Sequence, residues 1–422
     1  MRNLPRPSMT RDITTRAAQA PRALRMLARA GLALVVAFTL GAAQPAHADA
    51  AFDRWVENFW PQARAAGVSR DTYRRAFANV TPDPDTLRLM DKQSEFVKPI
   101  FEYLDTAVSD NRVETGREML QTYARELAAI ERHFGVQKEV VVAIWGMETN
   151  YGKFMGKHYV VRALATLAYA APRRKEFWRS ELITALKIID AGHVSPENME
   201  GSWAGAMGHT QFMPSSWRRY SADYDGDGRR DIWTNIPDAL SSSANYLKEH
   251  GWQTGKTWGY EVVLPRGFDY SLAETEKTLG EWARIGVSRP NGRGFPRPSD
   301  DAELILPAGA SGPAFLMLRN FFVIKRYNNA TAYALAVGHL ADRVRGGGPF
   351  VHEWDRSALP LNRSEVKELQ NLLNRRGYSV GTADGMAGPA TRRGIRAFQR
   401  AIGVIPDGFA SQRLLARVRA GR

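Results

Sequence analysis

The chain has 422 residues, of which 44% are apolar and 24% charged, so it is long enough for two or three folded globular domains. It has no cysteine, which excludes disulfides, thiolate metal sites, cysteine nucleophiles and lipid attachment through a cysteine. The formal net charge is +14, which raises the question of an anionic partner.

Residues 1–48 have the pattern of a secretory signal peptide. They contain seven Arg and a single acidic residue, followed by an apolar segment over Ala30–Ala43. Ala46-His47-Ala48 then matches an A-x-A cleavage site. The apolar segment is short for a membrane span, and no later stretch has transmembrane character. We therefore expect an exported, soluble mature protein that begins near Asp49.

The positive charge is concentrated at the two ends of the chain. Residues 361–422 contain twelve Lys or Arg and four acids, whereas the residues between the signal and this unit have no net charge. The basic excess thus belongs to a targeting segment and one small terminal unit. In an exported protein, this distribution favours an anionic extracellular polymer as the partner and not nucleic acid.

Residues 49–130 have the apolar periodicity of helices. The apolar residues that begin this pattern are Phe52, Trp55, Phe59 and Trp60. A capped helix start is predicted at Asp71. A further helix is predicted over Val113–Phe134, ended by Gly135. These stripes are interpreted as core.

An apolar run over Val140–Trp145 leads to one carboxylate, Glu148. The polar and flexible residues 149–152 follow at once. Apolar neighbours raise the pKa of a carboxyl group, which is what a general acid requires at neutral pH. The alternative is an ordinary exposed residue at the end of a helix.

The next predicted helices flank a short basic segment. Val160–Ala171 is alanine-rich, and Arg173, Arg174 and Lys175 open the helix that follows. Three successive cations are interpreted as a solvated helix start. In a cleft, the same cations would meet carboxylates of a substrate.

Residues Ser202–Tyr220 are rich in small and polar side chains. Gly201, Gly205 and Gly208 permit a close approach of the backbone. Gln211 is a candidate to orient a water or a sugar N-acetyl group. A packed loop between helices explains the composition equally well.

The sharpest local motif is DYDGDGRRD over residues 223–231. Asp223, Asp225 and Asp227, followed by Gly228, match positions 1, 3, 5 and 6 of a calcium loop. The backbone carbonyl of Arg229 is the next ligand in that template. Position 12 is a Thr where a Glu is expected, and Asp238 is a candidate replacement. Hard oxygen ligands favour calcium over a transition metal. The alternative is a solvated Asx-rich turn.

The remainder of the chain alternates helix and sheet patterns. Ile236–Glu249 is predicted as a helix, residues 253–313 as a β-rich insert, and Phe321–Val344 as a helix. The short runs with β propensity are Tyr260–Leu264, Ala302–Leu306 and Ala314–Leu318. Residues 346–360 are a predicted linker, and residues 361–422 a small three-helix unit without space for a large active site.

Five motifs in a single order give residues 51–345 a specific resemblance to the family-B lytic murein transglycosylases. They are GMETNYG at 146–152, AGAMGHTQFMPSS at 204–216, the aspartate loop at 223–227, ANYL at 244–247 and RYNN at 326–329. Residues 361–418 resemble the type-1 peptidoglycan-binding domain. The marks of that domain are LQ at 369–370, DG at 384–385, GPAT at 388–391, FQ at 398–399 and DG at 407–408.

The resemblance implies a mainly α, lysozyme-like α+β core over residues 49–345 and a C-terminal three-helix peptidoglycan-binding bundle. It implies that Glu148 is the single catalytic acid/base. The residues that would line the sugar cleft are Ser202, Gln211, Tyr246, Tyr327, Asn328 and Tyr333. Arg173 and Arg174 match an arginine pair near the stem peptide, but Phe177 stands where a tyrosine is expected. The implied calcium ligands are Asp223, Asp225, Asp227, the carbonyl of Arg229, and Asp238.

Glycoside cleavage commonly uses two carboxylates, and no second acid stands out near Glu148. One carboxyl group suffices if the substrate N-acetyl oxygen attacks its own C1. The expected reaction cleaves the MurNAc-β-1,4-GlcNAc bond without water and leaves 1,6-anhydro-MurNAc ends. A hydrolytic muramidase and a non-catalytic peptidoglycan-binding scaffold are the alternatives.

The expected setting of the protein follows from the same resemblance. We expect a periplasmic monomer that acts on glycan strands, with cell-wall synthesis proteins as further candidate partners. A structural calcium ion is expected, and no organic cofactor, nucleic acid or stable membrane span after removal of the signal.

Overall fold

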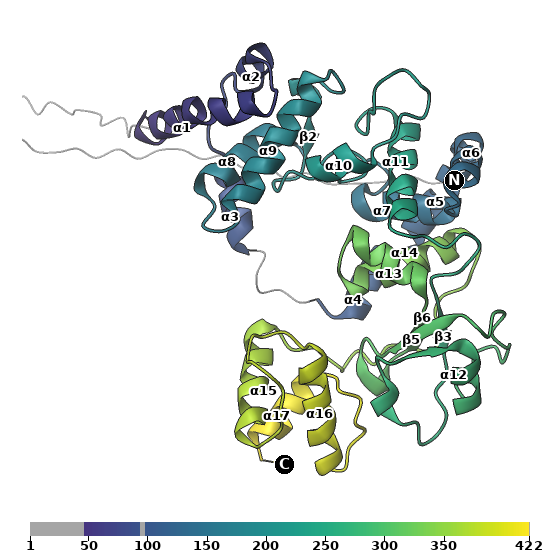
Figure 1. The fold of residues 1–422 in the computed structure, drawn as a ribbon. Helices are drawn as coiled ribbons and strands as arrows, with labels where there is room; N and C mark the ends of the chain where they lie inside the picture. The colour runs from purple at the N-terminus through teal and green to yellow at the C-terminus, as the bar shows by residue number, and fades with distance from the viewer. Residues whose placement is uncertain (1–45, 93–97, 422) are drawn as a thin grey trace, which may run out of the picture. The chain divides into compact units, whose positions relative to one another are not determined.

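The computed structural model describes residues 46–92 and 98–421 (Figure 1). The apolar segment of the predicted signal peptide lies outside these residues, and the A-x-A triplet forms the first turn of α1 (Ala46–Ala65). Within the described ranges, no helix combines the length and the apolar character that a membrane span requires.

Helices dominate the structure. The helices before the sheet are α2 (Arg70–Ala76), α3 (Pro84–Lys92), α4 (Ile100–Ala107), α5 (Asp110–Thr122), α6 (Ala124–Phe134), α7 (Lys138–Thr149), α8 (Val160–Ala170), α9 (Lys175–Asp190), α10 (Pro214–Tyr220) and α11 (Ile236–Glu249). Those after its first strands are α12 (Leu279–Ile285), α13 (Arg319–Tyr327), α14 (Thr331–Val344), α15 (Arg363–Arg375), α16 (Pro389–Ala401) and α17 (Gln412–Arg419). Three 3-10 turns cover Pro196–Asn198, Tyr270–Leu272 and Gly309–Ser311.

The central element is α7. All residues from Val140 to Gly146 are buried, as expected for a helix that is apolar on every side. It packs against α14, α5, α11 and α6, which surround it in Figure 1. The helix ends at Asn150, whose φ of 50° is the left-handed conformation that Asn tolerates. Glu148 is thereby placed in the last turn, at the edge of the core.

Two predicted helices are each broken in the structure. The helix predicted over Val113–Phe134 is divided into α5 and α6 at Tyr123, whose ring packs edge-on against Trp145 at 5.8 Å. The helix predicted over Phe321–Val344 is divided into α13 and α14, because Asn328 adopts an extended conformation. Single long helices were therefore wrong at both places, and tertiary contacts override the local periodicity.

The β-rich insert forms an antiparallel four-stranded sheet in the order β3-β6-β5-β4. Its strands are β3 (Gly259–Val262), β4 (Glu276–Thr278), β5 (Asp301–Ile305) and β6 (Ala314–Met317). The three predicted β runs correspond to β3, β5 and β6 and are confirmed, whereas β4 and α12 were not predicted. Trp282 on α12 and Leu304 and Leu316 from the sheet are fully buried, so the insert has a small core of its own. A two-stranded pair, β1 (His158–Tyr159) and β2 (Glu200–Gly201), lies outside it.

The C-terminal helices α15–α17 enclose a separate apolar core that includes Leu369, Leu373, Ile395 and Leu415. Two glutamines repeat one arrangement within it. The Gln370 amide accepts from Gly385 N and donates to Asp384 Oδ1, and the Gln399 amide does the same with Gly408 and Asp407. The LQ pair at 369–370 and the FQ pair at 398–399 therefore each stabilise one of two equivalent DG turns.

The predicted linker, residues 346–360, is fixed by specific contacts along its length. The Phe350 ring stacks on His339 with centroids 3.7 Å apart, and Glu261 accepts hydrogen bonds from the backbone of Val351 and His352. Arg356 forms an ion pair with Asp105 at 2.8 Å. This segment is therefore a packed connection and not a free tether.

Candidate active site

Glu148 lies at the end of α7, and its side chain is part-buried. Burial raises the pKa of Glu148 to about 7, and a hydrogen bond from Tyr333 opposes the shift. The Tyr333 hydroxyl donates to Oε1 of Glu148 at 2.5 Å. A carboxyl group with this pKa is partly protonated at neutral pH and is able both to give and to accept a proton.

Three tyrosines face the Glu148 carboxylate. Burial raises the pKa of Tyr333 and Tyr327 far above the ordinary value and that of Tyr103 to about 12, and the nearby Glu148 carboxylate adds to each shift. Tyr333 lies on α14, Tyr327 at the end of α13 and Tyr103 on α4. The sequence analysis missed Tyr103, because it belongs to an ordinary amphipathic helix with no motif around it.

The break between α13 and α14 is held by hydrogen bonds. The Tyr327 hydroxyl donates to the carbonyl of Thr210 at 2.7 Å, and the Tyr246 hydroxyl donates to the carbonyl of Arg326 at 2.5 Å. Asn328 is exposed just beyond these anchors. The predicted residues Tyr246, Tyr327, Asn328 and Tyr333 are therefore brought together, although they come from three helices.

Residues 202–220 contact these helices through the carbonyl of Thr210. Gln211 has a φ of 50°, and its amide nitrogen donates to the carbonyls of Met155 and Gly208 at 2.9 and 3.0 Å. Two backbone acceptors thus fix the amide group and leave its oxygen as the acceptor for a ligand. The Ser202 hydroxyl accepts from the backbone of Ala204 and Ala206, so its principal contacts stabilise the turn.

The loop after Glu148 is closely packed against this segment. Gly156 has a φ of 93°, and a Cβ atom there would lie 2.0 Å from the carbonyl oxygen of Gly201. The indole of Trp145 donates to Nδ1 of His209 at 3.0 Å, and Thr149 donates to the carbonyl of His209. The residues on both sides of Glu148, Trp145 and Thr149, are thus hydrogen-bonded to His209.

No second carboxylate adjoins Glu148 among the described residues. The side-chain contact of Glu148 among the described residues is the hydrogen bond from Tyr333, and no carboxylate shares it. Neither the sequence motifs nor the hydrogen bonds and ion pairs of the described residues provide a second acid in contact with Glu148.

Arg173 and Arg174 lie at the start of α9 and are exposed. The Arg174 guanidinium lies over the Phe177 ring at 4.0 Å from its centroid. Phe177 therefore takes the place of the expected tyrosine as an aromatic support, without a hydroxyl group. No hydrogen bond or ion pair within the described ranges joins this arginine pair to the group around Glu148.

The aspartate loop brings three exposed carboxylates together. Oxygens of Asp223, Asp225 and Asp227 lie within 4.8 Å of one another. The Asp223 carboxylate accepts from the backbone of Gly226 and Gly228, which shapes the loop around this point. Three hard oxygen donors in one place fit a calcium ion.

Asp238 lies beneath this loop and is fully buried. Its oxygens accept from Tyr224 N at 2.7 Å and from Asp231 N at 2.8 Å, so the carboxylate joins the two ends of the loop. Burial and the charges of Asp225 and Asp223 raise its pKa to about 6, against the opposing hydrogen bonds. Asp238 is not one of the three converging carboxylates.

Comparison with known proteins agrees with this arrangement. The transglycosylase SLT domain family matches residues 51–342, and the putative peptidoglycan binding domain family matches residues 362–418. Membrane-bound lytic murein transglycosylase B of Escherichia coli (strain K12) is 34% identical over 293 residues, which cover 66% of this chain and 79% of that protein.

Solved structures extend the similarity to most of the chain. SltB3 from Pseudomonas aeruginosa in complex with NAG-NAM-pentapeptide is 49% identical, with a TM-score of 0.85 over 87% of this chain and 99% of that one. The same protein in complex with NAG-anhNAM-pentapeptide matches equally well. The Escherichia coli lytic transglycosylase SLT35 in complex with calcium is 32% identical, with a TM-score of 0.59 over 69% of this chain and 92% of that one.

The chain belongs to the transglycosylase SLT domain family, as a family-B lytic transglycosylase with a C-terminal peptidoglycan-binding domain. It is an enzyme, and the expected mainly α, lysozyme-like fold is confirmed.

Proposed function

We propose that Glu148 is the single acid/base of this lytic transglycosylase and that the substrate supplies the nucleophile. The observation that carries the proposal is one part-buried carboxyl group with a pKa raised to about 7 and no second acid adjoining it among the described residues. An enzyme that relies on two carboxylates would need a partner for Glu148 within about 10 Å.

In the first step, protonated Glu148 gives its proton to the oxygen that bridges MurNAc and GlcNAc. The C1–O bond breaks as the N-acetyl oxygen of the MurNAc attacks C1, which forms an oxazolinium ion and leaves Glu148 ionised. The Tyr333 hydrogen bond stabilises the ionised carboxylate at this point.

In the second step, the Glu148 carboxylate removes the proton of the C6 hydroxyl. The C6 oxygen attacks C1 and displaces the N-acetyl oxygen, so that the product is 1,6-anhydro-MurNAc and no water is consumed. Glu148 is protonated again and ready for the next cleavage. The NAG-anhNAM-pentapeptide bound to SltB3 is a product of this kind and supports the scheme.

The remaining cleft residues would bind and orient the sugars. The fixed amide of Gln211 and the hydroxyl of Tyr327 are suited to hold the N-acetyl group and the developing charge. Tyr246 would position the segment that carries Tyr327 and Asn328, and Ser202 the turn over residues 202–206. Arg173 and Arg174 are exposed cations suited to the carboxylates of a stem peptide.

Calcium binding would stabilise the aspartate loop. The proposed ligands are Asp223, Asp225, Asp227 and the carbonyl of Arg229, with Asp238 as the internal support and a candidate fifth ligand. The calcium complex of SLT35 supports this assignment. The role would be structural, because no step of the scheme requires a Lewis acid.

The C-terminal domain would hold the enzyme on its polymer. Twelve Lys or Arg against four acids give residues 361–422 a charge that suits an anionic wall. Together with the predicted signal peptide, this charge supports the proposal that the enzyme acts in the periplasm, as a monomer on glycan strands and near proteins of cell-wall synthesis.

The reaction is tested by digestion of purified sacculi in water enriched in oxygen-18. The expected muropeptides have the mass of anhydro ends and carry no label, and Glu148→Gln releases none of them. Labelled reducing ends would identify a hydrolytic muramidase. Full activity of Glu148→Gln would remove Glu148 from the mechanism.

A further inference from the structure

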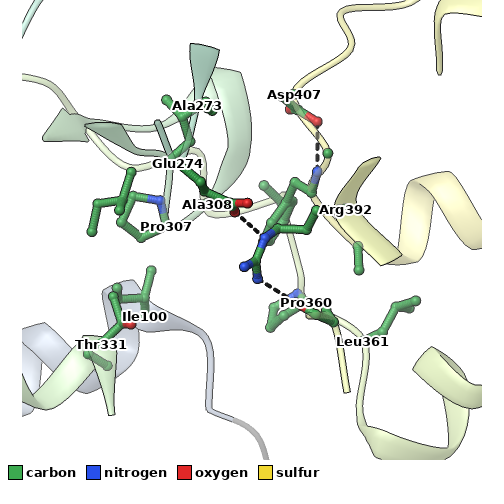
Figure 2. Close-up of a pocket in the computed structure, with 18 of the residues that line it drawn as sticks. Ile100, Ala273, Glu274, Pro307, Ala308, Thr331, Pro360, Leu361, Arg392 and Asp407 are labelled. Atoms are coloured by element: carbon green, nitrogen blue, oxygen red, sulfur yellow. Dashed lines mark hydrogen bonds and ion pairs between the residues drawn. The ribbon is translucent and has the colours of Figure 1, made fainter. Parts of the chain in front are cut away.

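A cavity of about 450 Å³ lies apart from Glu148, which is not among its lining residues. Its lining residues come from the insert, α4, the helices α13 and α14, the linker and the C-terminal domain. Figure 2 labels Glu274 of the insert, Ile100 of α4 and Arg392 of the C-terminal domain around it. Thr331 and Ala332, which are two residues and one residue before Tyr333, line it. The cavity and the acid site therefore share the first turn of α14.

Three of the six charged residues that line this cavity, Glu274, Arg392 and Asp407, are already paired. Glu274, which has a φ of 66°, forms ion pairs with Arg392 and Arg396 of the C-terminal domain. Asp407 accepts from the backbone of Ala310 at 2.9 Å and from Gln399 at 2.7 Å. These contacts join the insert to the C-terminal domain and leave little capacity for a ligand.

The other three are Glu303, Lys325 and Lys98, of which Lys98 is exposed and the first two are part-buried. Glu303, on β5, is part-buried in the cavity and has no hydrogen bond or ion pair within the described part of the chain. Burial and the charges of Glu274 and Glu276 raise the pKa of Glu303, and Lys325 and Arg392 oppose them. Lys325 has only a long contact of 3.5 Å to the Thr331 hydroxyl.

An ammonium group is the natural partner of a carboxylate in this position, since a part-buried charge is costly unless it is paired. The Lys325 ammonium would take a carboxylate in the same way. A ligand that satisfies both groups carries an ammonium and a carboxylate close together, as an amino-acid end does. Ile305, Phe321 and Phe322 line the cavity beside them and suit a short hydrocarbon chain.

We propose that this cavity binds the zwitterionic amino-acid end of a peptidoglycan stem peptide, with Glu303 on the ammonium and Lys325 on the carboxylate. The proposal rests on the proposed function only in taking peptidoglycan as the polymer. A sugar would leave both charges unpaired, whereas stem peptides carry free carboxylates and, at a diamino acid, a free amine. A peptide bound here would lie beside the helix that carries Tyr333.

Binding of a soluble stem pentapeptide with a free diamino-acid side chain to the full-length protein, measured by calorimetry, tests the proposal. We expect Glu303→Gln to weaken binding about tenfold, the loss of one charge-assisted contact. Glu118→Gln is the control, because Glu118 is exposed on α5 and does not line the cavity. Its affinity should equal that of the wild type.

A second arm identifies the group that Glu303 recognises. Acetylation of the peptide amine should weaken binding to the wild type by the same factor, and should have no further effect in Glu303→Gln. Equal affinity of the wild type and Glu303→Gln, or no binding to either, would overturn the proposal. Thermal unfolding of Glu303→Gln and Glu118→Gln at the same temperature excludes a folding defect.

The outcome is separable from the mechanism at Glu148. Glu148→Gln should bind the free pentapeptide with wild-type affinity while it cleaves no glycan. Glu303→Gln should cleave glycan strands stripped of their peptides at the wild-type rate. Loss of cleavage of these bare strands in Glu303→Gln would assign Glu303 a structural role instead.

Discussion

The site around Glu148 and the aspartate loop use the same functional group under opposite conditions. Glu148 is one part-buried carboxyl group, and burial raises its pKa to about 7. Asp223, Asp225 and Asp227 are three exposed carboxylates in a solvated loop. Hydrogen bonds from the backbone and side chain of Arg229 lower the pKa of Asp227.

The difference shows that the environment decides what a carboxylate does. A buried, isolated group keeps a proton and is able to transfer it, at a cost in stability whenever it ionises. Exposed, convergent groups stay ionised and repel one another until a cation joins them. The experiments below remove a carboxylate, its hydrogen bond or the cation, and they are ordered from the largest expected effect to the smallest.

Glu148→Gln should lower the rate of cleavage of purified sacculi by about a thousandfold or more, because the amide has no proton to transfer. Muropeptide release followed by chromatography measures the loss. Glu118→Gln, an exposed substitution on the neighbouring α5, is the control and should retain the wild-type rate. A rate for Glu148→Gln within tenfold of the wild type would contradict the role of Glu148 as the acid.

Glu148→Gln should also become more stable against unfolding than the wild-type protein as the pH rises. The pKa of Glu148 is about 7 in the folded protein and 4.5 in the reference state, so the unfolded chain ionises first. Wild-type stability therefore falls relative to that of Glu148→Gln between pH 4.5 and about 7, by up to about 3 kcal/mol, and the difference is constant above that range. Denaturant unfolding of both proteins at several pH values measures it.

Two outcomes of that comparison are informative. Glu118→Gln should show no such pH-dependent difference, since its carboxylate is exposed. A stability difference between Glu148→Gln and the wild type that stays the same from pH 4 to 8 would mean that burial does not raise the pKa of Glu148.

Calcium should stabilise the protein against heat. At about a hundred times the dissociation constant, an ion bound only by the folded state adds about 2.7 kcal/mol, or a rise of several degrees in Tm. Asp225→Asn should abolish most of the shift between calcium and a chelator. Asp71→Asn, an exposed substitution on α2, should retain it. An equal Tm of the wild-type protein with calcium and with a chelator would exclude the loop as a calcium site.

Tyr333→Phe should have the smallest effect of this series, about a tenfold loss of activity. Removal of its hydrogen bond leaves the ionised Glu148 less stabilised, so the pKa of Glu148 rises further. The alkaline limit of the pH–rate profile should therefore move to higher pH. Tyr73→Phe, which loses a buried hydrogen bond to the Val56 carbonyl, is the control. A pH–rate profile that moves equally in both variants would remove Tyr333 from the proton transfer.

The sequence by itself determined the elements with strong local patterns. The apolar run before Glu148 predicted a buried helix with a carboxylate at its end, because a helix that is apolar on every side has no solvated face. The spacing of Asp223, Asp225 and Asp227 predicted their convergence, because alternation and a glycine turn are local properties of the chain. Five motifs in one order were enough to indicate the family.

Only the tertiary structure decided how distant segments meet. The break after Tyr327 depends on the carbonyl of Thr210, which is 117 residues away in the chain, so helical periodicity did not predict it. Tyr103 faces Glu148 through the packing of α4, with no local signal. Glu303 has no ion pair within the described ranges, and the cavity that it lines is built by segments far apart in the chain. Contacts of this kind depend on the surroundings of a side chain, which a linear pattern does not contain.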